Sequence, residues 1–181
     1  MAIELKRLTE NELELLMNWR MREDISKMMF SNVKLTMEGQ RKWFEKIRYS
    51  ETEIRWIIWK DSVPVGSLYF TNIDRANLRC ESGWFIAEKK GIDFSQVISL
   101  QRNSFDYAFD VLGLNRVYGL ILDDNKGLPK MLEMCGISRE GVLKQHVIKD
   151  GVPHDVIVVG ITKSDWQKKK VNMKYEKIAI E

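Results

Sequence analysis

Cysteine is scarce in this chain of 181 residues, which contains only Cys80 and Cys135. Two cysteines cannot form the disulfide framework that holds small secreted domains together, and neither has companions at the spacing of metal ligands. Cys135 also lies in an apolar segment without an adjacent base, which argues against a nucleophilic role. We therefore expect two buried thiols.

Long apolar runs are absent, as is a strong excess of charge. No run approaches the roughly 20 apolar residues needed to span a bilayer, and the first residues, MAIELKRLTENELE, are acidic where a signal peptide needs an apolar core. The formal net charge of +3 is too small to indicate a nucleic-acid partner. These absences predict a cytoplasmic protein that has neither a membrane nor a nucleic acid as partner.

Internal repeats and low-complexity linkers are also missing, and 44% of the residues are hydrophobic. This composition is typical of a globular protein, and a chain of this length can fold around a single hydrophobic core. We predict a single domain over residues 1–181, ending in a basic tail at 164–181. The lysines of that tail fit a solvated helix face or a binding patch.

The first half of the chain combines helices with an antiparallel hairpin. Alternation over residues 3–6 is typical of an edge strand, and helical spacing of apolar residues marks segments 11–19 and 25–30. Thr36 is a candidate N-cap for a further helix. Residues 53–60 and 65–73 are rich in aromatic and β-branched side chains and are separated by turn formers, which predicts a hairpin.

The second half places a strand, a turn and a long helix in direct succession. We predict a strand over 79–86, a helix over 94–112, a strand over 116–122 and a helix over 126–135. A closing hairpin follows at 141–148 and 156–161, with its turn at Asp150 and Gly151. The fold class is therefore α/β (α+β), with a mixed, mostly antiparallel central sheet flanked by helices.

The turn before the long helix is a candidate anion site. The first backbone amides of a helix lack intrahelical partners, and the helix dipole is positive at that end. Lys89 and Lys90 add positive charge there. Asp93, with Gln96 three residues later, has the signature of a capping box, and its carboxylate would compete with a bound anion for the same amides.

Three stretches, ESGWFIAEKKGIDFSQV, LGLNRVYGLILDDNK and REGVLKQHVIKDGVPHDVIVVGI, resemble the acyl-CoA binding core of the GNAT superfamily of N-acyltransferases. The resemblance implies the GNAT fold, acetyl-CoA or another acyl-CoA as cofactor, and transfer of an acyl group to an amine. In that superfamily the turn reads Arg or Gln, two variable residues, Gly, one variable residue, then Gly or Ala. This chain keeps Gly91 but places Asp93 at the second glycine, so its pyrophosphate loop is degenerate.

The resemblance also implies which residues bind the cofactor. Backbone groups of the splayed strand would pair with the pantetheine arm, the turn would hold the pyrophosphate, and the start of the next helix would contribute further contacts. The strand residues are Trp84, Phe85, Ile86 and Ala87. The turn residues are Lys89, Lys90, Gly91, Ile92, Asp93, Phe94 and Ser95. The helix residues are Asn125 and Lys130, and Asn125 also fits an N-cap.

Acyl transfer to an amine needs a proton acceptor and a group that protonates the departing thiolate. The tyrosine that many relatives use as the acid is replaced by Leu132. Glu81 is the best remaining acid or base, although a salt bridge on the strand would also explain it. His146 is the second candidate, and a structural role for it remains open.

The front half narrows the resemblance to the amino-sugar N-acetyltransferases of the pseudaminic acid pathway, although Gln40 stands where that group tends to have histidine. The resemblance implies a small-molecule amine as partner and, by analogy with relatives, a homodimer as candidate assembly. An acceptor pocket could be lined by Trp19, Arg20, Arg22, Met29 and Trp43, or these side chains could belong to the core and the surface. Two alternatives stay open: a protein N-terminus or polyamine as acceptor, which a strongly acidic pocket would favour, and a catalytically reduced binding module.

Overall fold

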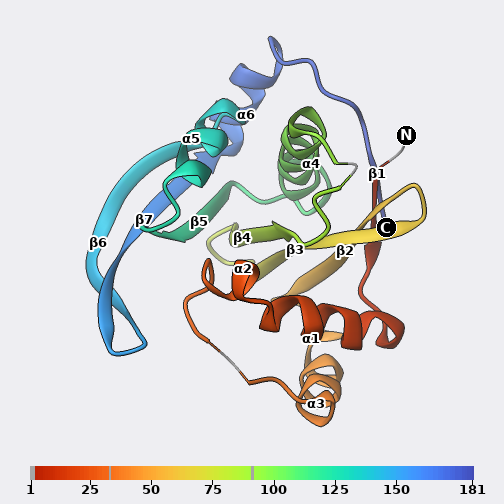
Figure 1. Ribbon diagram of the computed structural model, residues 1–181. Helices are drawn as coiled ribbons and strands as arrows, with labels where there is room; N and C mark the ends of the chain where they lie inside the picture. The colour runs from red at the N-terminus through yellow and green to blue at the C-terminus, as the bar shows by residue number, and fades with distance from the viewer. Residues whose placement is uncertain (1–2, 33, 91) are drawn as a thin grey trace.

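The computed structural model describes residues 3–32, 34–90 and 92–181 of the chain (Figure 1). In this described part the strands form one eight-stranded sheet in the order β6-β7-β5-β4-β3-β2-β1-β8. The strands are β1 (Ile3–Arg7), β2 (Ile54–Lys60), β3 (Val63–Asp74), β4 (Arg79–Ile86), β5 (Arg116–Leu122), β6 (Ser138–Lys149), β7 (Val152–Thr162) and β8 (Ala179–Ile180).

Most neighbouring strands are antiparallel, and β4–β5 and β1–β8 are the parallel pairs. The predicted mixed sheet and both predicted hairpins are therefore confirmed. The hairpin of β6 and β7 turns at Asp150 and Gly151, which both have positive φ, as a tight hairpin turn requires. The prediction of an edge strand at the N-terminus is wrong, because β8 pairs outside β1.

Three helices cover one face of the sheet: α1 (Leu13–Met21), α2 (Glu23–Ser26) and α3 (Met37–Ile47). The short helix η1 (Glu10–Glu12) leads into α1, and Thr36 caps α3 as predicted, with its hydroxyl accepting from the Gly39 amide at 3.2 Å. The helix predicted over 25–30 is wrong in extent, because α2 ends at Ser26. The carbonyls of Ser26, Lys27 and Met29 instead accept hydrogen bonds from the buried ammonium of Lys149.

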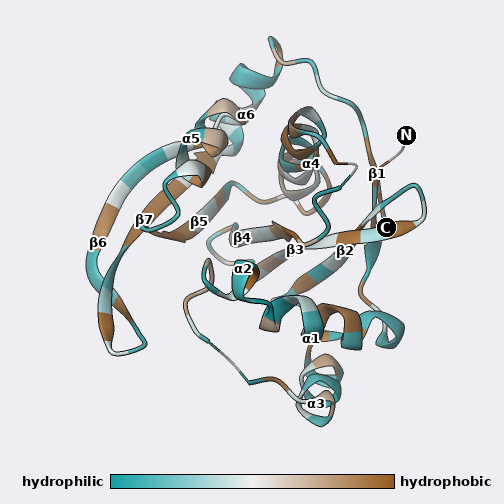
Figure 2. Cartoon of the chain, in the orientation of Figure 1, coloured by the Kyte–Doolittle hydropathy of each residue, from teal (hydrophilic) through white to brown (hydrophobic). Residues whose placement is uncertain are grey.

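The other face carries α4 (Phe94–Asp106), η2 (Tyr107–Val111), α5 (Gly127–Met134) and α6 (Lys163–Lys170). The long helix predicted at this place is confirmed, although its last turn, η2, is a π-helix in which the Leu112 amide donates to the Tyr107 carbonyl. Figure 2 shows apolar residues along β5 and β7, whereas β6 at the periphery is largely hydrophilic. None of these described helices combines the length and the apolar character that crossing a bilayer requires.

The basic C-terminal segment is built into the fold. After α6 the chain crosses α4, where the Asn103 side chain bonds the Glu176 carbonyl and the Ile178 amide, and then forms β8. Asp106 accepts hydrogen bonds from Tyr175, Lys177 and Trp166. Residues 164–181 therefore close the sheet against α4, while Lys168, Lys169, Lys174 and Lys177 stay exposed.

Candidate active site

The central feature of the site is a split between β4 and β5. These parallel strands pair at only three positions, Arg79 with Arg116, Cys80 with Val117 and Glu81 with Tyr118. Beyond Glu81, β4 continues beside β3 while β5 continues beside β7. Backbone groups along the facing edges are therefore left without a strand partner, which is the splay expected for an acyl-CoA cleft.

A cavity of about 470 Å³ occupies this split. Its walls are mostly apolar and come from both strands, from α4 and α5, and from the segment after α2. Among its lining residues are Trp84, Ile86, Val97, Leu120, Met131 and Leu132. The Trp84 indole donates to the Gln101 side chain at 2.6 Å, so that ring is held between β4 and α4.

One end of the cavity, which we call the donor end, consists of the turn at 89–95 and the first turn of α4. Asp93 caps the helix as predicted: its carboxylate accepts from the Gln96 amide at 2.9 Å, and Gln96 Oε1 accepts from the Asp93 amide at 3.1 Å. The Gln96 amide holds the pKa of Asp93 below its ordinary value, with further help from Ser95 and Lys60. The buried ammonium of Lys60 also donates to Gln96 Oε1.

The predicted cofactor residues divide into two groups. The cavity is lined by Trp84, Phe85, Ile86, Lys89, Phe94 and Asn125. Lys90, Ile92, Asp93 and Ser95 lie in the turn beside it, Lys130 is exposed on α5, and Gly91 lies outside the described residues. Asn125 is not the cap of α5, because Lys126 holds that position.

Ala87 does not fit the predicted contact with the pantetheine arm. Its amide donates to the Val65 carbonyl at 2.8 Å, and its carbonyl accepts from Arg22 Nη2 at 3.0 Å. Both polar groups of its backbone are therefore already bonded within the protein. The prediction is corrected for this residue, because the chain still pairs with β3 at Ala87, one residue beyond the end of β4.

Two of the predicted acceptor residues serve the fold. Trp19 is 3% exposed, packs edge-on against Phe85 and donates to Glu88. Arg22 bonds both oxygens of Asp24 and also Glu88. These contacts leave neither side chain free for a substrate, whereas Met29 lines the main cavity and stays a candidate acceptor residue.

Arg20 and Trp43 line a second hollow of about 320 Å³, together with Lys34 and the first turn of α3. Arg55 lies behind this hollow. Its guanidinium carbon is 5.0 Å from the centre of the Trp43 ring and 4.4 Å from the centre of the Tyr69 ring, which itself lines the main cavity. We call this assembly of Arg20, Lys34, Trp43, Arg55 and Tyr69 the acceptor end.

The acceptor end holds more positive charge than its neighbours neutralise. Arg55 is 9% exposed and bonds Glu53 at 2.9 Å, but the buried Nε atoms of both Arg20 and Arg55 have no hydrogen-bond partner among the described residues. Burial lowers the pKa of Arg20, and the charge of Arg55 lowers it further. Two guanidinium groups therefore share a partly buried site with one bonded carboxylate.

The structure separates the two predicted catalytic residues. Glu81 stands where β4 leaves β5, opposite Tyr118, and accepts from the Asn72 side chain at 3.0 Å. Neither Glu81 nor His146 is among the described residues that line the cavity, but Glu81 is next to the lining residue Ser82, whereas His146 is exposed on β6. The prediction of two buried thiols is confirmed, and burial raises the pKa of Cys135 to about 12.

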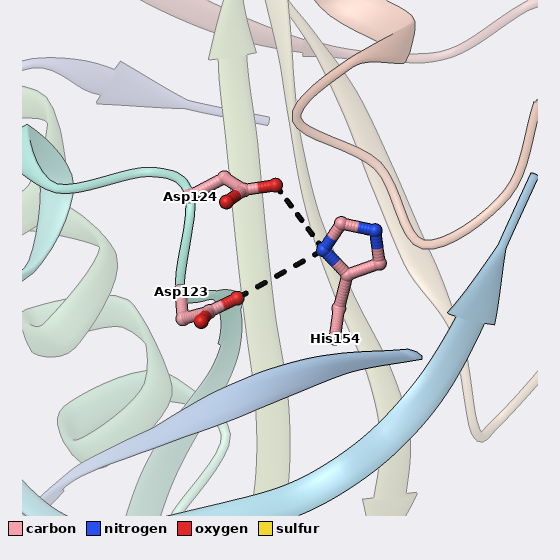
Figure 3. A group of neighbouring side chains, drawn as sticks. All are labelled: Asp123, Asp124 and His154. Atoms are coloured by element: carbon pink, nitrogen blue, oxygen red, sulfur yellow. Dashed lines mark ion pairs between the residues drawn. The ribbon is translucent and has the colours of Figure 1, made fainter. Parts of the chain in front are cut away.

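Sequence reasoning missed a cluster of three ionisable side chains at the end of β5. Figure 3 shows Asp123, Asp124 and His154, with His154 Nδ1 3.1 Å from Asp124 Oδ2 and 4.0 Å from Asp123 Oδ1. Such a group can hold a metal ion, and it also forms an ion pair whenever the imidazole is protonated. Only the pairing of β5 with β7 brings the histidine to the aspartates, so sequence spacing held no signal.

Arg55 and Tyr69 were missed as well. Both lie in strands that the sequence predicted, and they are paired directly across β2 and β3. Strand alternation places such residues on a common face, but it does not reveal which face meets the cleft.

Comparisons with known proteins agree with this geometry. The family model for the acetyltransferase (GNAT) domain matches residues 2–138. The uncharacterized N-acetyltransferase YoaA of Bacillus subtilis is 31% identical over 66% of this chain and 68% of its own length. The acetyltransferase PseH of Campylobacter jejuni is 26% identical over 72% of this chain and 82% of its own.

The fold is also that of a spermidine N-acetyltransferase from Vibrio cholerae, solved in complex with CoA and spermine. The TM-score is 0.85 at 21% identity, over 92% of this chain and 98% of the other. The split sheet, the helix N-terminus at its mouth and the matched family model lead to one conclusion. The chain belongs to the GNAT acetyltransferase family and is an N-acetyltransferase that uses acetyl-CoA.

Proposed function

We propose that the chain transfers the acetyl group of acetyl-CoA to the primary amine of a small molecule, by direct attack while both substrates are bound. The observation that carries this proposal is the separation of β4 from β5 at Glu81, which opens an apolar cavity between the two chain edges. The start of α4 and Tyr69 both contribute to the lining of this cavity, and Tyr69 also contacts Arg55 of the acceptor end. A donor and an acceptor can therefore meet between the two strands.

The residues present fit acetyl-CoA. Free backbone edges of β4 and apolar side chains such as Leu120 and Met131 suit the pantetheine arm, and Asn125 lines the same wall. Phe94 and Ser95 begin α4, where amides lack intrahelical acceptors, and Lys89 adds positive charge. Bound there, acetyl-CoA supplies an activated acetyl thioester.

Glu81 is the group we propose as proton acceptor. An amine attacks only through its free lone pair, so a base must take a proton from it directly or through water. Glu81 is half-buried at the point where the strands part, and one oxygen is already oriented by Asn72. A carboxylate placed there can receive the proton without any covalent enzyme intermediate.

The charge of the site favours an acceptor that carries negative charge as well as its amine. Among the described residues that line the main cavity, Asp24 is the one carboxylate, and Arg22 bonds both of its oxygens. The acceptor end adds Arg20 and Lys34. This pattern supports a nucleotide-linked amino sugar, the substrate class suggested by the resemblance to the pseudaminic acid pathway enzymes.

A polyamine is the second candidate, supported by the fold shared with the spermidine N-acetyltransferase. A polycation needs carboxylates along its path, which the described lining of the cavity does not offer in free form. A protein N-terminus is the remaining candidate acceptor. The catalytically reduced binding module draws its support from Asp93, whose carboxylate occupies one of the helix amides.

A two-stage experiment tests these alternatives. Calorimetric titration with acetyl-CoA comes first, followed by an assay of released thiol with a nucleotide-linked amino sugar, spermidine and a peptide with a free N-terminus. We expect binding, and fastest turnover with the amino sugar. Binding without turnover of any amine would favour the binding module, and preference for spermidine would overturn the choice of acceptor.

The cytoplasm, where acetyl-CoA is made and used, is the proposed location. A homodimer remains a proposal by analogy with relatives, and sedimentation of the purified protein would test it.

A further inference from the structure

The ring of Tyr69 lies over the split between β4 and β5, in space that a glycine on β4 leaves open. Tyr69 on β3 pairs with Gly83 on β4, the second residue after the strands part. A Cβ atom at position 83 would collide with the phenol carbon and oxygen of Tyr69. The phenol therefore lies directly on the backbone of β4 at Gly83, and both residues line the cavity where β5 no longer pairs with β4.

The surroundings of this phenol suit a proton donor. No hydrogen bond of the Tyr69 hydroxyl to a described residue is found, so the hydroxyl is free to meet a ligand. Burial is the main cause that raises the pKa of Tyr69 above its ordinary value, which keeps the hydroxyl protonated at neutral pH. Arg55, stacked 4.4 Å from the ring centre, and Arg20 favour the phenolate and so oppose part of that rise.

Tyr69 lies between the cavity and several charged side chains. On its open side Tyr69 faces the cavity, and on the covered side it faces Arg55, whose charge is shared with Glu53. Glu81 lies on the same face of the sheet, two residues before Gly83, and its charge raises the pKa of Tyr69. A carboxylate and a phenol on one face of a split can serve as base and acid.

Resting on the proposed function, we infer that Tyr69 is the catalytic acid of the transfer, in the role that Leu132 cannot fill. The amine nitrogen forms the new bond to the acetyl carbon, the carbon–sulfur bond breaks, and its electron pair remains on sulfur. The Tyr69 hydroxyl proton passes to that sulfur, and the proton lost by the amine goes to Glu81. Solvent then restores the proton of Tyr69 and removes that of Glu81.

Other described groups near the cavity fit this role less well. Leu132 and Met131 of α5 carry no proton to donate, and the buried Cys135 thiol faces Met131 Sδ. Tyr118 is the rival, because it also lines the cavity and burial raises its pKa. Tyr118, however, pairs with Glu81 at the closed end of the split, whereas Tyr69 lies over the first separated residues.

The test is Tyr69→Phe, which keeps the ring over Gly83 and against Arg55 but removes the hydroxyl. We expect kcat to fall by roughly 100-fold, the scale of general acid catalysis, with little change in the KM for acetyl-CoA. A second readout needs no acceptor: the pKa of the CoA thiol bound to the protein, followed by thiolate absorbance, should rise in the variant. A donated hydrogen bond stabilises the thiolate, so its loss favours the protonated thiol.

Three further variants complete the experiment. Gly83→Ala keeps the hydroxyl but displaces the phenol, and should also lower kcat, whereas Tyr107→Phe, in the aromatic core beside Trp56, should match the parent protein. An unchanged kcat and thiol pKa in Tyr69→Phe would overturn the inference, as would a larger loss in Tyr118→Phe. If the parent protein failed to bind acetyl-CoA at all, the proposed function itself would fail before this comparison began.

Discussion

The donor end, which borders the main cavity, and the acceptor end, which borders the second hollow, differ in how their charges are paired. At the donor end the protein supplies its own anion, because the Asp93 carboxylate bonds an amide of α4 and Lys60 bonds its capping partner Gln96. At the acceptor end Arg20 and Arg55 crowd together with Glu53 as the one bonded carboxylate. One end is satisfied within the fold, and the other is left with excess positive charge.

This difference indicates where a ligand's charge is needed. Buried groups are normally paired, so excess charge beside a cavity is a feature of functional sites. A satisfied donor end predicts that acetyl-CoA gains less at the phosphates and more along the split strand. An unsatisfied acceptor end predicts that the second substrate brings an anionic group.

The largest expected effect comes from removing Arg55. Arg55→Met leaves Glu53 without its bonded partner and takes the guanidinium from between the rings of Trp43 and Tyr69. We expect the free energy of unfolding to fall by about 3 kcal/mol, the scale for breaking a buried ion pair. Urea denaturation measures this free energy, and Arg48→Met, which changes a more exposed arginine, is the control. Equal losses of stability in the two variants would contradict a special role for the buried Arg55.

Arg20→Met should change binding without that loss of stability. The substitution relieves the repulsion from Arg55, so the free energy of unfolding should not decrease, while affinity for an anionic acceptor should fall roughly tenfold. The measurement is the KM for the acceptor at fixed acetyl-CoA. If the KM of the variant rose equally for spermidine and for the anionic amine, Arg20 would not select acceptors by their charge.

Asp93→Gly tests the donor end. The change removes the carboxylate from the start of α4 and restores a glycine to the turn, so acetyl-CoA should bind roughly fivefold more tightly. Calorimetric titration measures the dissociation constant, and Asp93→Asn, which keeps a capping oxygen without the charge, should give a smaller gain. Unchanged affinity in Asp93→Gly would mean that self-capping does not compete with the phosphates.

The smallest expected effect is the dependence of stability on pH due to Asp93. Its pKa is lower in the folded protein, so its stabilising contribution is complete above about pH 4, its ordinary range, and is lost as pH falls through the folded value. Asp93→Asn should lack this part of the acid destabilisation. The measurement is the thermal unfolding of the parent protein and of Asp93→Asn at several acidic pH values. If the stability of the two proteins fell equally with pH, the expected contribution of Asp93 would be contradicted.

Much of the fold was predictable because it depends on local pattern. Aromatic and β-branched runs marked β2 and β3, and Asp93 with Gln96 predicted the start of α4 together with its cap. Predictions failed where distant segments intervene. Lys149 takes the carbonyls that would extend α2, and β8 covers the edge that β1 would have presented.

The candidate site was predictable only in part. The sequence selected Trp84, Phe85 and Ile86, which line the cavity, because the predicted site follows the order of the chain through strand, turn and helix. The residues of the acceptor end were predicted less well, because Trp19 and Arg22 bond Glu88, while Arg55 and Tyr69 lie in strands for which only a structural role was predicted. Which face of a strand meets a cavity depends on the neighbours that cover the other face.

By itself, the sequence determined the succession of elements, the capped turn before α4 and the family. The tertiary structure decided how the protein uses them. It separated β4 from β5, laid Tyr69 on Gly83, and brought Arg20 near Arg55 across the sheet-and-helix interface. The physical reason is that residue pattern and helix capping depend on neighbours a few positions away in the chain. Charge interactions, burial and strand pairing depend on residues that only folding brings together.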